Sequence, residues 1–344
     1  MKKILLCLII FIAYIKPVNA TEFWAKNYIV MEQSSLQVLE GKDIHQTQSV
    51  ASISKIMTAI IVLENVDLRT MITIGEEINR AYGSGIYIHI GDEITIQDLL
   101  YGLMLRSGND AALALAYYVG EDSVENFVEL MNNKAIEIGM KNTVFSNPSG
   151  LDEEDLGNVS SVYDMGLLMS YCLNNEQFKQ IASTTSYKRL DGKGTWKNKN
   201  KLLDMYEYTT AGKTGFTKKA KRTLISSAKK DGVELIVVTF NCGDDFMFHK
   251  SLFESYFNLY NQVLWLNRGI HRVDDYYFEA DKPLFYPMDY SLKDTSFLNY
   301  EIIENEAIVN VYLNIKDEKI FLSSYSIKKN RINWFLKVFN GEKL

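Results

Sequence analysis

Cysteine is scarce in this sequence, with three in 344 residues, and one of them, Cys7, lies in the apolar N-terminal segment. The other two are Cys172 and Cys242. Two cysteines this far apart do not make the ligand pattern of a zinc site, and their spacing does not predict a disulfide. We expect both to be buried free thiols.

An excess of positive charge is also absent. The formal net charge is -6, whereas a nucleic-acid-binding protein normally carries a basic face, so we expect no nucleic-acid partner. We find no internal repeats and no low-complexity linker. The content of 47% hydrophobic and 23% charged residues is typical of a globular protein with a sizeable core, and the length suits two domains.

The N-terminus combines a basic start, "MKK", with the apolar run "ILLCLIIFIAYI" and the small-residue site Val18-Asn19-Ala20. This order is typical of a secretory signal peptide, and the apolar run is short for a membrane span. We therefore predict a signal peptide over 1–20 and export across the cytoplasmic membrane. Cys7 would leave with that peptide. The alternative is an uncleaved signal anchor.

The spacing of apolar residues predicts several helices. Residues 50–66 are apolar almost all round, which indicates a central buried helix. Residues 96–119 have the pattern of two helical stretches broken at Ser107-Gly108-Asn109. Further helices are expected over 122–139, 161–182 and 246–266.

Strand patterns dominate the last third of the chain. Residues 222–230 and 234–242 read as two strands joined at the turn signal Asp231-Gly232. Short β-type runs separated by polar turns fill 270–328 and indicate a small all-β domain. We predict a first domain over 21–267, a β-sandwich-like domain over 268–328, and a tail over 329–344. Lysine, arginine and aromatic residues in this tail favour an amphipathic helix on a membrane surface, while a last strand with a loose end is the alternative.

The stretch "ASISKIMTAI" places Ser52 one helical turn before Lys55. A serine hydroxyl needs a base to become a nucleophile, and a lysine whose pKa is lowered can serve. The same S-x-x-K spacing also begins at Ser226, Ser227 and Ser326, but these lie in strand-like segments where the two side chains point to opposite faces. Alone, the pair is equally compatible with an ordinary buried helix start.

Two further motifs follow in the chain. Ser107-Gly108-Asn109 places a hydroxyl and an amide together at a helix break, where they could relay a proton and hold a carbonyl. Lys213-Thr214-Gly215 offers a cation, a hydroxyl and a backbone without a side chain, which suit a carboxylate held against a strand. Each motif alone is also compatible with a simple turn.

The ordered set S-x-x-K, S-x-N and K-T-G resembles the signature of the penicillin-recognising serine acyl-transferases. The stretches "SVASISKIMTAIIVLE", "LRSGNDAALALA" and "WKNKNKLLDMYEYTTAGKTGFT" are similar to those of low-molecular-mass D-alanyl-D-alanine carboxypeptidases, and the resemblance runs almost continuously from 24 to 245. It implies an α/β (α+β) serine β-lactamase/transpeptidase-like domain. Helices would cover both sides of an antiparallel sheet, and a small all-β domain would follow.

The resemblance also implies a reaction. Ser52 would attack the carbonyl between the two terminal D-alanines of a peptidoglycan stem peptide and form an acyl-enzyme, with Lys55 accepting its proton. Ser107, oriented by Asn109, would pass a proton to the departing D-alanine. The base must be neutral, and we expect the charge of Lys213 to lower the pKa of Lys55.

The third motif is implied in substrate binding. Lys213 and Thr214 would hold the terminal carboxylate, and Gly215 would allow close approach. The N–H groups of Ser52 and Phe216 would form an oxyanion hole. The resemblance implies no cofactor and no metal, and it implies that penicillin and other β-lactams acylate Ser52.

The sequence departs from the family at two places. Where relatives often have a histidine after "NPSGLD", this chain has Asn158, and "KKAKR" after K-T-G carries four positive charges. Three alternative functions stay open. These are a D,D-endopeptidase of peptidoglycan cross-links, a class A-like β-lactamase and an inactive peptidoglycan-binding module. The β-lactamase lacks support because no E-x-x-L-N run occurs between 110 and 212.

Overall fold

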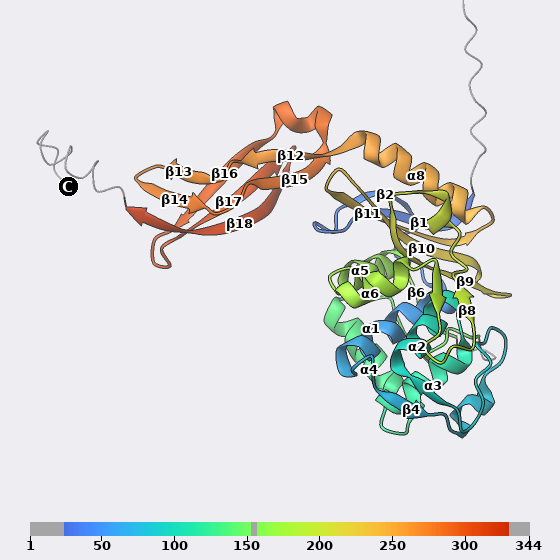
Figure 1. Ribbon diagram of the computed structural model, residues 1–344. Coiled ribbons are helices and arrows are strands. Elements are labelled where there is room, and N and C mark those ends of the chain that lie inside the picture. The colour runs from blue at the N-terminus through green and yellow to red at the C-terminus, as the bar shows by residue number, and fades with distance from the viewer. Residues whose placement is uncertain (1–23, 153–156, 330–344) are drawn as a thin grey trace, which may run out of the picture.

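The computed structural model describes residues 24–152 and 157–329 (Figure 1). The predicted signal peptide lies outside these residues, and so does the predicted tail apart from Lys329. In the part of the chain that is described, no helix is both long and apolar enough to cross a membrane.

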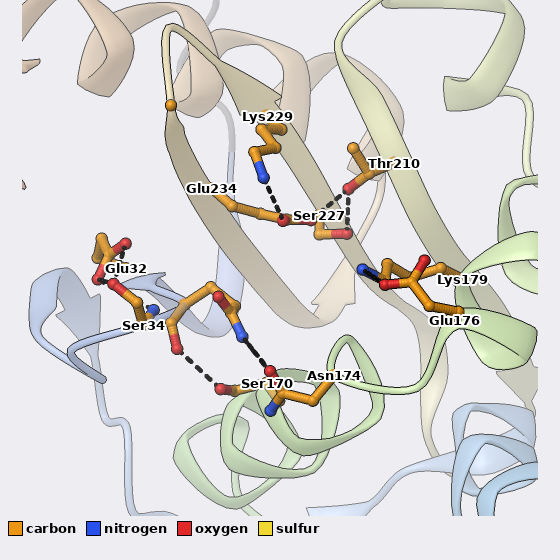
Figure 2. Close-up of polar contacts among 12 residues, drawn as sticks. Glu32, Ser34, Ser170, Asn174, Glu176, Lys179, Thr210, Ser227, Lys229 and Glu234 are labelled. Carbon is orange, nitrogen blue, oxygen red and sulfur yellow. Dashed lines mark hydrogen bonds and ion pairs between the residues drawn. The ribbon is translucent and has the colours of Figure 1, made fainter. Parts of the chain in front are cut away.

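A five-stranded antiparallel sheet organises the first domain, with strand order β2-β1-β11-β10-β9. Its strands are β1 (Ala25–Glu32), β2 (Val38–Lys42), β9 (Thr209–Thr217), β10 (Lys221–Lys230) and β11 (Val233–Cys242). The predicted hairpin is present, since β10 and β11 pair from Lys230↔Val233 to Thr223↔Phe240 around Asp231-Gly232, both with positive φ. Side chains tie neighbouring strands as well. Thr210 Oγ1 lies 2.7 Å from Ser227 Oγ and donates to Glu234 Oε1 at 2.7 Å, which links β9, β10 and β11 (Figure 2).

Helices cover both faces of this sheet, as predicted. One face carries a cluster of helices built from α1 (Lys55–Asn65), α2 (Ile96–Tyr101), α3 (Asn109–Val119), α4 (Val124–Ile138), α5 (Val162–Cys172) and α6 (Glu176–Ser183). The opposite face packs against α8 (Asp245–Leu259), mainly through Phe253 and Phe257. Because both faces are covered, β11 is almost continuously apolar rather than alternating.

Side-chain caps explain where several helices begin. Thr95, Ser123, Ser161 and Asn175 each accept a hydrogen bond from the N–H three residues further on, at the starts of α2, α4, α5 and α6. The cap at Asn175 also corrects one prediction. The single helix expected over 161–182 is two helices, because the chain turns at 173–175 and starts again at this cap.

Short elements complete the first domain. Three of them are helical turns: η1 (Ala51–Ser54), η2 (Glu76–Arg80) and η3 (Gly102–Arg106). The others are α7 (Leu202–Met205) and the strand pairs β3 (Gln48–Ser49) with β6 (Val159–Ser160), β4 (Met71–Thr73) with β5 (Glu93–Thr95), and β7 (Ser186–Lys188) with β8 (Thr195–Lys197). Both Cys172 and Cys242 are free and buried, as expected.

From the end of α8 to Lys329, the described residues form strands and one short 3-10 helix, and these strands lie apart from the first sheet (Figure 1). They form a sheet in the order β13-β14-β18-β17-β16 and a separate pair, β12 with β15. Their bounds are β12 (Tyr260–Leu266), β13 (Gly269–Val273), β14 (Tyr276–Ala280), β15 (Leu284–Asp289), η4 (Tyr290–Thr295), β16 (Phe297–Ile303), β17 (Ile308–Ile315) and β18 (Glu318–Lys329).

The helix predicted over 246–266 is wrong in its last part. It ends at Leu259, and residues 260–266 form β12. The stretch "YNQVLWL" buries Val263 and Leu266 and pairs with β15, so the pairing partner decides its conformation. The division at 267/268 stays a prediction.

Candidate active site

Ser52 lies at the edge of the sheet, in the turn η1 immediately before α1. Ala51 has a left-handed backbone with φ of 52°, a conformation that is uncommon for residues other than glycine. Gly150, at φ 78°, packs against this residue so closely that a Cβ there would overlap the Ala51 carbonyl. The backbone around Ser52 is therefore held by its neighbours and not by helix propensity.

Lys55 is fully buried at the first position of α1, with its ammonium group directed back to Ser52. Its Nζ lies 3.0 Å from Ser52 Oγ and donates to Asn109 Oδ1 at 2.7 Å and to the backbone oxygen of Ser149. Burial, then the charge of Lys213, then that of Lys199, hold the pKa of Lys55 well below its ordinary value of 10.5. The expected influence of Lys213 on this base is thus present.

The second motif occupies a real break between helices. The π-helical turn η3 ends at Ser107, which adopts a left-handed conformation with φ of 62°, and α3 starts at Asn109. Strained residues of this kind persist where the surrounding structure holds them, often at functional sites. The Asn109 amide donates to Tyr82 O at 2.6 Å, which leaves its oxygen directed at Lys55.

Lys213 connects the second and third motifs. It lies on β9 with 1% of its surface exposed, and its Nζ donates to Ser107 Oγ at 3.0 Å and to Thr214 O at 2.7 Å. Burial, followed by the charge of Lys199, lowers the pKa of Lys213 to about 7.

Gly215 brings β9 against Ser52. A Cβ built on this glycine would lie 3.0 Å from Ser52 N, so the two backbones are in close contact. Phe216 follows and is 65% exposed at the rim. A cleft of about 340 Å³ lies over these groups, and five of the predicted site residues line it: Ser52, Ser107, Thr214, Gly215 and Phe216. Asn109 lines an adjoining cleft that shares Ser52 with the first.

Sequence reasoning missed several residues of the site. Lys199 donates to Ser84 Oγ at 3.0 Å across the mouth of the cleft. Arg222 lines the same cleft, where both oxygens of the buried Asp245 carboxylate accept from its guanidinium and Phe246 stacks 5.4 Å from it. The positive run "KKAKR" could have pointed to Arg222, but no signal in the sequence indicated the backbone oxygen of Ser149.

A sequence profile of the family described as D-alanyl-D-alanine carboxypeptidase matches residues 15–243. The chain belongs to this family. The D-alanyl-D-alanine carboxypeptidase DacF of Bacillus subtilis is 36% identical over 224 residues, which cover 63% of this chain and 57% of that relative. The D-alanyl-D-alanine endopeptidase of Haemophilus influenzae is 32% identical over 207 residues, which cover 58% of this chain and 69% of that protein.

The likeness in fold to a solved structure extends through the C-terminal strands. The crystal structure of penicillin binding protein 5 from Haemophilus influenzae superimposes with a TM-score of 0.76, covering 91% of this chain and 99% of that one at 23% identity. This likeness confirms the predicted fold class, including an all-β region after the helical and sheet domain. The family resemblance inferred from the three motifs is confirmed as well.

Proposed function

We propose that this chain is a serine-type D-Ala-D-Ala carboxypeptidase that releases the terminal D-alanine from peptidoglycan stem peptides. The observation that carries the proposal is the set of partners around Lys55. A neutral amine has two N–H groups and one lone pair. The carbonyl oxygens of Asn109 and Ser149 can only accept, so they take both N–H groups. The lone pair is then left for the Ser52 hydroxyl, 3.0 Å away.

The first half of the reaction follows from this geometry. The Ser52 oxygen bonds to the carbonyl carbon while its proton moves to Lys55, and the N–H groups of Ser52 and Phe216 stabilise the oxyanion. The carbon–nitrogen bond then breaks, and Ser107 supplies the proton that the departing D-alanine needs. Ser107 in turn takes a proton from the Lys213 ammonium, which lies 3.0 Å from its Oγ. Lys55 releases the proton of Ser52 to solvent, and Lys213 takes one up again, before the next step. Water hydrolyses the resulting ester and restores Ser52.

Binding of the terminal carboxylate is proposed for the region around Thr214. Lys213 would attract the carboxylate by its positive charge and not by a direct hydrogen bond. Its ammonium group is buried and already donates to Ser107 and Thr214. Since β-lactams resemble the acyl-D-Ala-D-Ala end, we propose that they acylate Ser52 as well. No step requires a cofactor.

Release of D-alanine tests this proposal most directly. The purified chain from residue 21 is incubated with a peptide that ends in D-Ala-D-Ala, and free D-alanine is measured. A fluorescent penicillin should label the same protein covalently, and the Ser52→Ala variant should remain unlabelled. Labelling of Ser52→Ala would refute the nucleophile assignment. Penicillin hydrolysis without D-alanine release would indicate a β-lactamase, and neither activity would indicate a binding module.

A D,D-endopeptidase is the second candidate, because a relative that carries that name shares 32% identity with this chain. The nucleophile would be the same and only the leaving group would differ. Cross-linked muropeptide dimers, supplied beside monomeric stem peptides, distinguish the two activities by which substrate is cleaved faster.

Export and membrane attachment are further proposals. The substrate lies outside the cytoplasmic membrane, which agrees with a signal peptide over 1–20. The apolar and basic residues of 329–344 suit attachment to a membrane surface. Unchanged binding to lipid vesicles after deletion of this tail would refute the attachment.

A further inference from the structure

The Ser149 carbonyl, one of the two acceptors that orient Lys55, lies on a turn over 146–150 that is buried from Asn147 on. The Asn147 side-chain oxygen shapes this turn by accepting from the N–H groups of Ser149 at 3.1 Å and Gly150 at 2.7 Å. Thr58, one turn after Lys55 on α1, donates to Pro148 O at 2.7 Å. The carbonyl therefore depends on a short irregular segment, whose position must come from its surroundings.

Asn158 is the side chain that anchors the beginning of this turn. It is 1% exposed, and its Oδ1 accepts from the N–H groups of Ser146 at 2.7 Å and Asn147 at 3.1 Å. Its Nδ2 donates to Asn147 O at 2.8 Å. An amide is suited to this position because it accepts and donates at the same time.

The backbone of the same residue reaches the other side of the site. The carbonyl of Asn158 accepts from Val50 N at 3.2 Å, two residues before the nucleophile Ser52. Asn158 thus connects the segment that presents Ser52 with the turn that presents the Ser149 carbonyl. Asn158 makes no hydrogen bond to Lys55 and does not line the cleft, and it belongs to none of the three motifs.

We propose that Asn158 is a positioning residue for the base. It holds the Ser149 carbonyl against Lys55, so that the lone pair of the neutral amine is directed at Ser52. The inference rests on the proposed function, because it concerns the base of that reaction.

Acylation by a fluorescent penicillin tests this role, with Asn132 as the matched control. Asn132 anchors the same segment further from Lys55, since it accepts from Phe145 N at 2.9 Å and donates to Phe145 O at 2.8 Å. We expect Asn158→Asp to lower the acylation rate constant roughly 10- to 100-fold, the cost of a small misplacement near the reacting groups. This variant keeps the acceptor oxygen but cannot donate to Asn147 O. Asn132→Asp should remain within about threefold of the native rate.

The pH dependence separates positioning from general loosening. In Asn158→Leu the ammonium form of Lys55 loses a well-placed acceptor, so the pH at which acylation rises should move lower while the plateau rate falls. If the substitution instead loosened the structure and admitted water to Lys55, the pH at which acylation rises would move higher. Native rates and an unmoved profile in Asn158→Asp would overturn the inference, whether or not Asn158→Leu folds. Failure of the native chain to be labelled would instead overturn the proposed function.

Discussion

Gly215→Ala probes the contact between β9 and the nucleophile. The added methyl group would lie 3.0 Å from Ser52 N, 3.2 Å from Ala51 Cβ, and closer to Thr223 Oγ1 than the sum of their van der Waals radii allows. Thr223 cannot swing aside freely, because it is fully buried and its hydroxyl donates to Val50 O at 3.0 Å. Relief of the Ser52 contact to 3.4 Å alone requires a shift of 0.4 Å (3.4 − 3.0), and the overlap with Thr223 requires more.

The expected cost follows from that shift. A displacement on the order of 1 Å near the reacting atoms lowers rates about 100-fold, and loss of one oxyanion donor lowers them about 100- to 1000-fold. We therefore expect penicillin acylation and D-alanine release to fall at least 100-fold. Gly243→Ala is the control, because a Cβ there meets nothing within 4 Å. A folded Gly215→Ala protein that reacts within threefold of the native rate would refute the proposed arrangement of β9 and Ser52.

Three other changes test the charged and titratable groups. Lys213→Met removes a charge that lowers the pKa of Lys55, so the rise of acylation with pH should move to higher pH in rate profiles. Arg222→Met removes the ion-pair partner of the buried Asp245 carboxylate, and because Arg222 itself is 43% exposed, the free energy of unfolding should fall by about 1–3 kcal/mol in urea titrations. The double change Arg222→Met with Asp245→Leu should largely reverse this loss. Burial lowers the pKa of His249 from 6.5 to about 3, so the unfolded state binds more protons below pH 6.5. Stability at pH 5 should therefore be about 2 kcal/mol lower than at pH 8 through this group, and His249→Gln should lack that part of the pH dependence.

Local pattern predicted the parts of the fold that local interactions determine. The hairpin around Asp231-Gly232 follows from a turn signal between two apolar runs, and the central helix after Ser52 follows from its continuous apolar sequence. The strand over 260–266 was missed because its conformation depends on β15, whose paired residues lie 18 (Leu266↔Leu284) to 29 (Tyr260↔Asp289) positions further along the sequence.

The candidate site also contains groups that the sequence predicted and groups that it could not predict. Most predicted residues carry a side chain with recognisable chemistry, and Gly215 and Phe216 belong to or directly follow the K-T-G motif, so motifs could point to all of them. The Ser149 carbonyl is a backbone group that any residue could supply, and its position depends on Asn147 and Asn158. The pairing of Arg222 with Asp245 joins β10 to the start of α8 and leaves no periodic trace in the sequence.

The burial of Lys213 lowers the free energy of unfolding of the domain. The pKa of this lysine is about 7 in the folded chain and 10.5 in its ordinary state. At neutral pH, folding therefore removes the proton from Lys213 in some molecules and buries a charged ammonium in the others. At pH 7 the difference corresponds to about 4 kcal/mol of lost stability, which is recovered as the pH rises to 10.5. Lys213→Met should consequently unfold at a higher denaturant concentration than the native chain at pH 7. A lower midpoint would mean that the contacts of Lys213 with Ser107 and Thr214 outweigh the desolvation of its charge. A proposed reaction that needs this buried lysine thus limits how stable the domain can become while it keeps the residue.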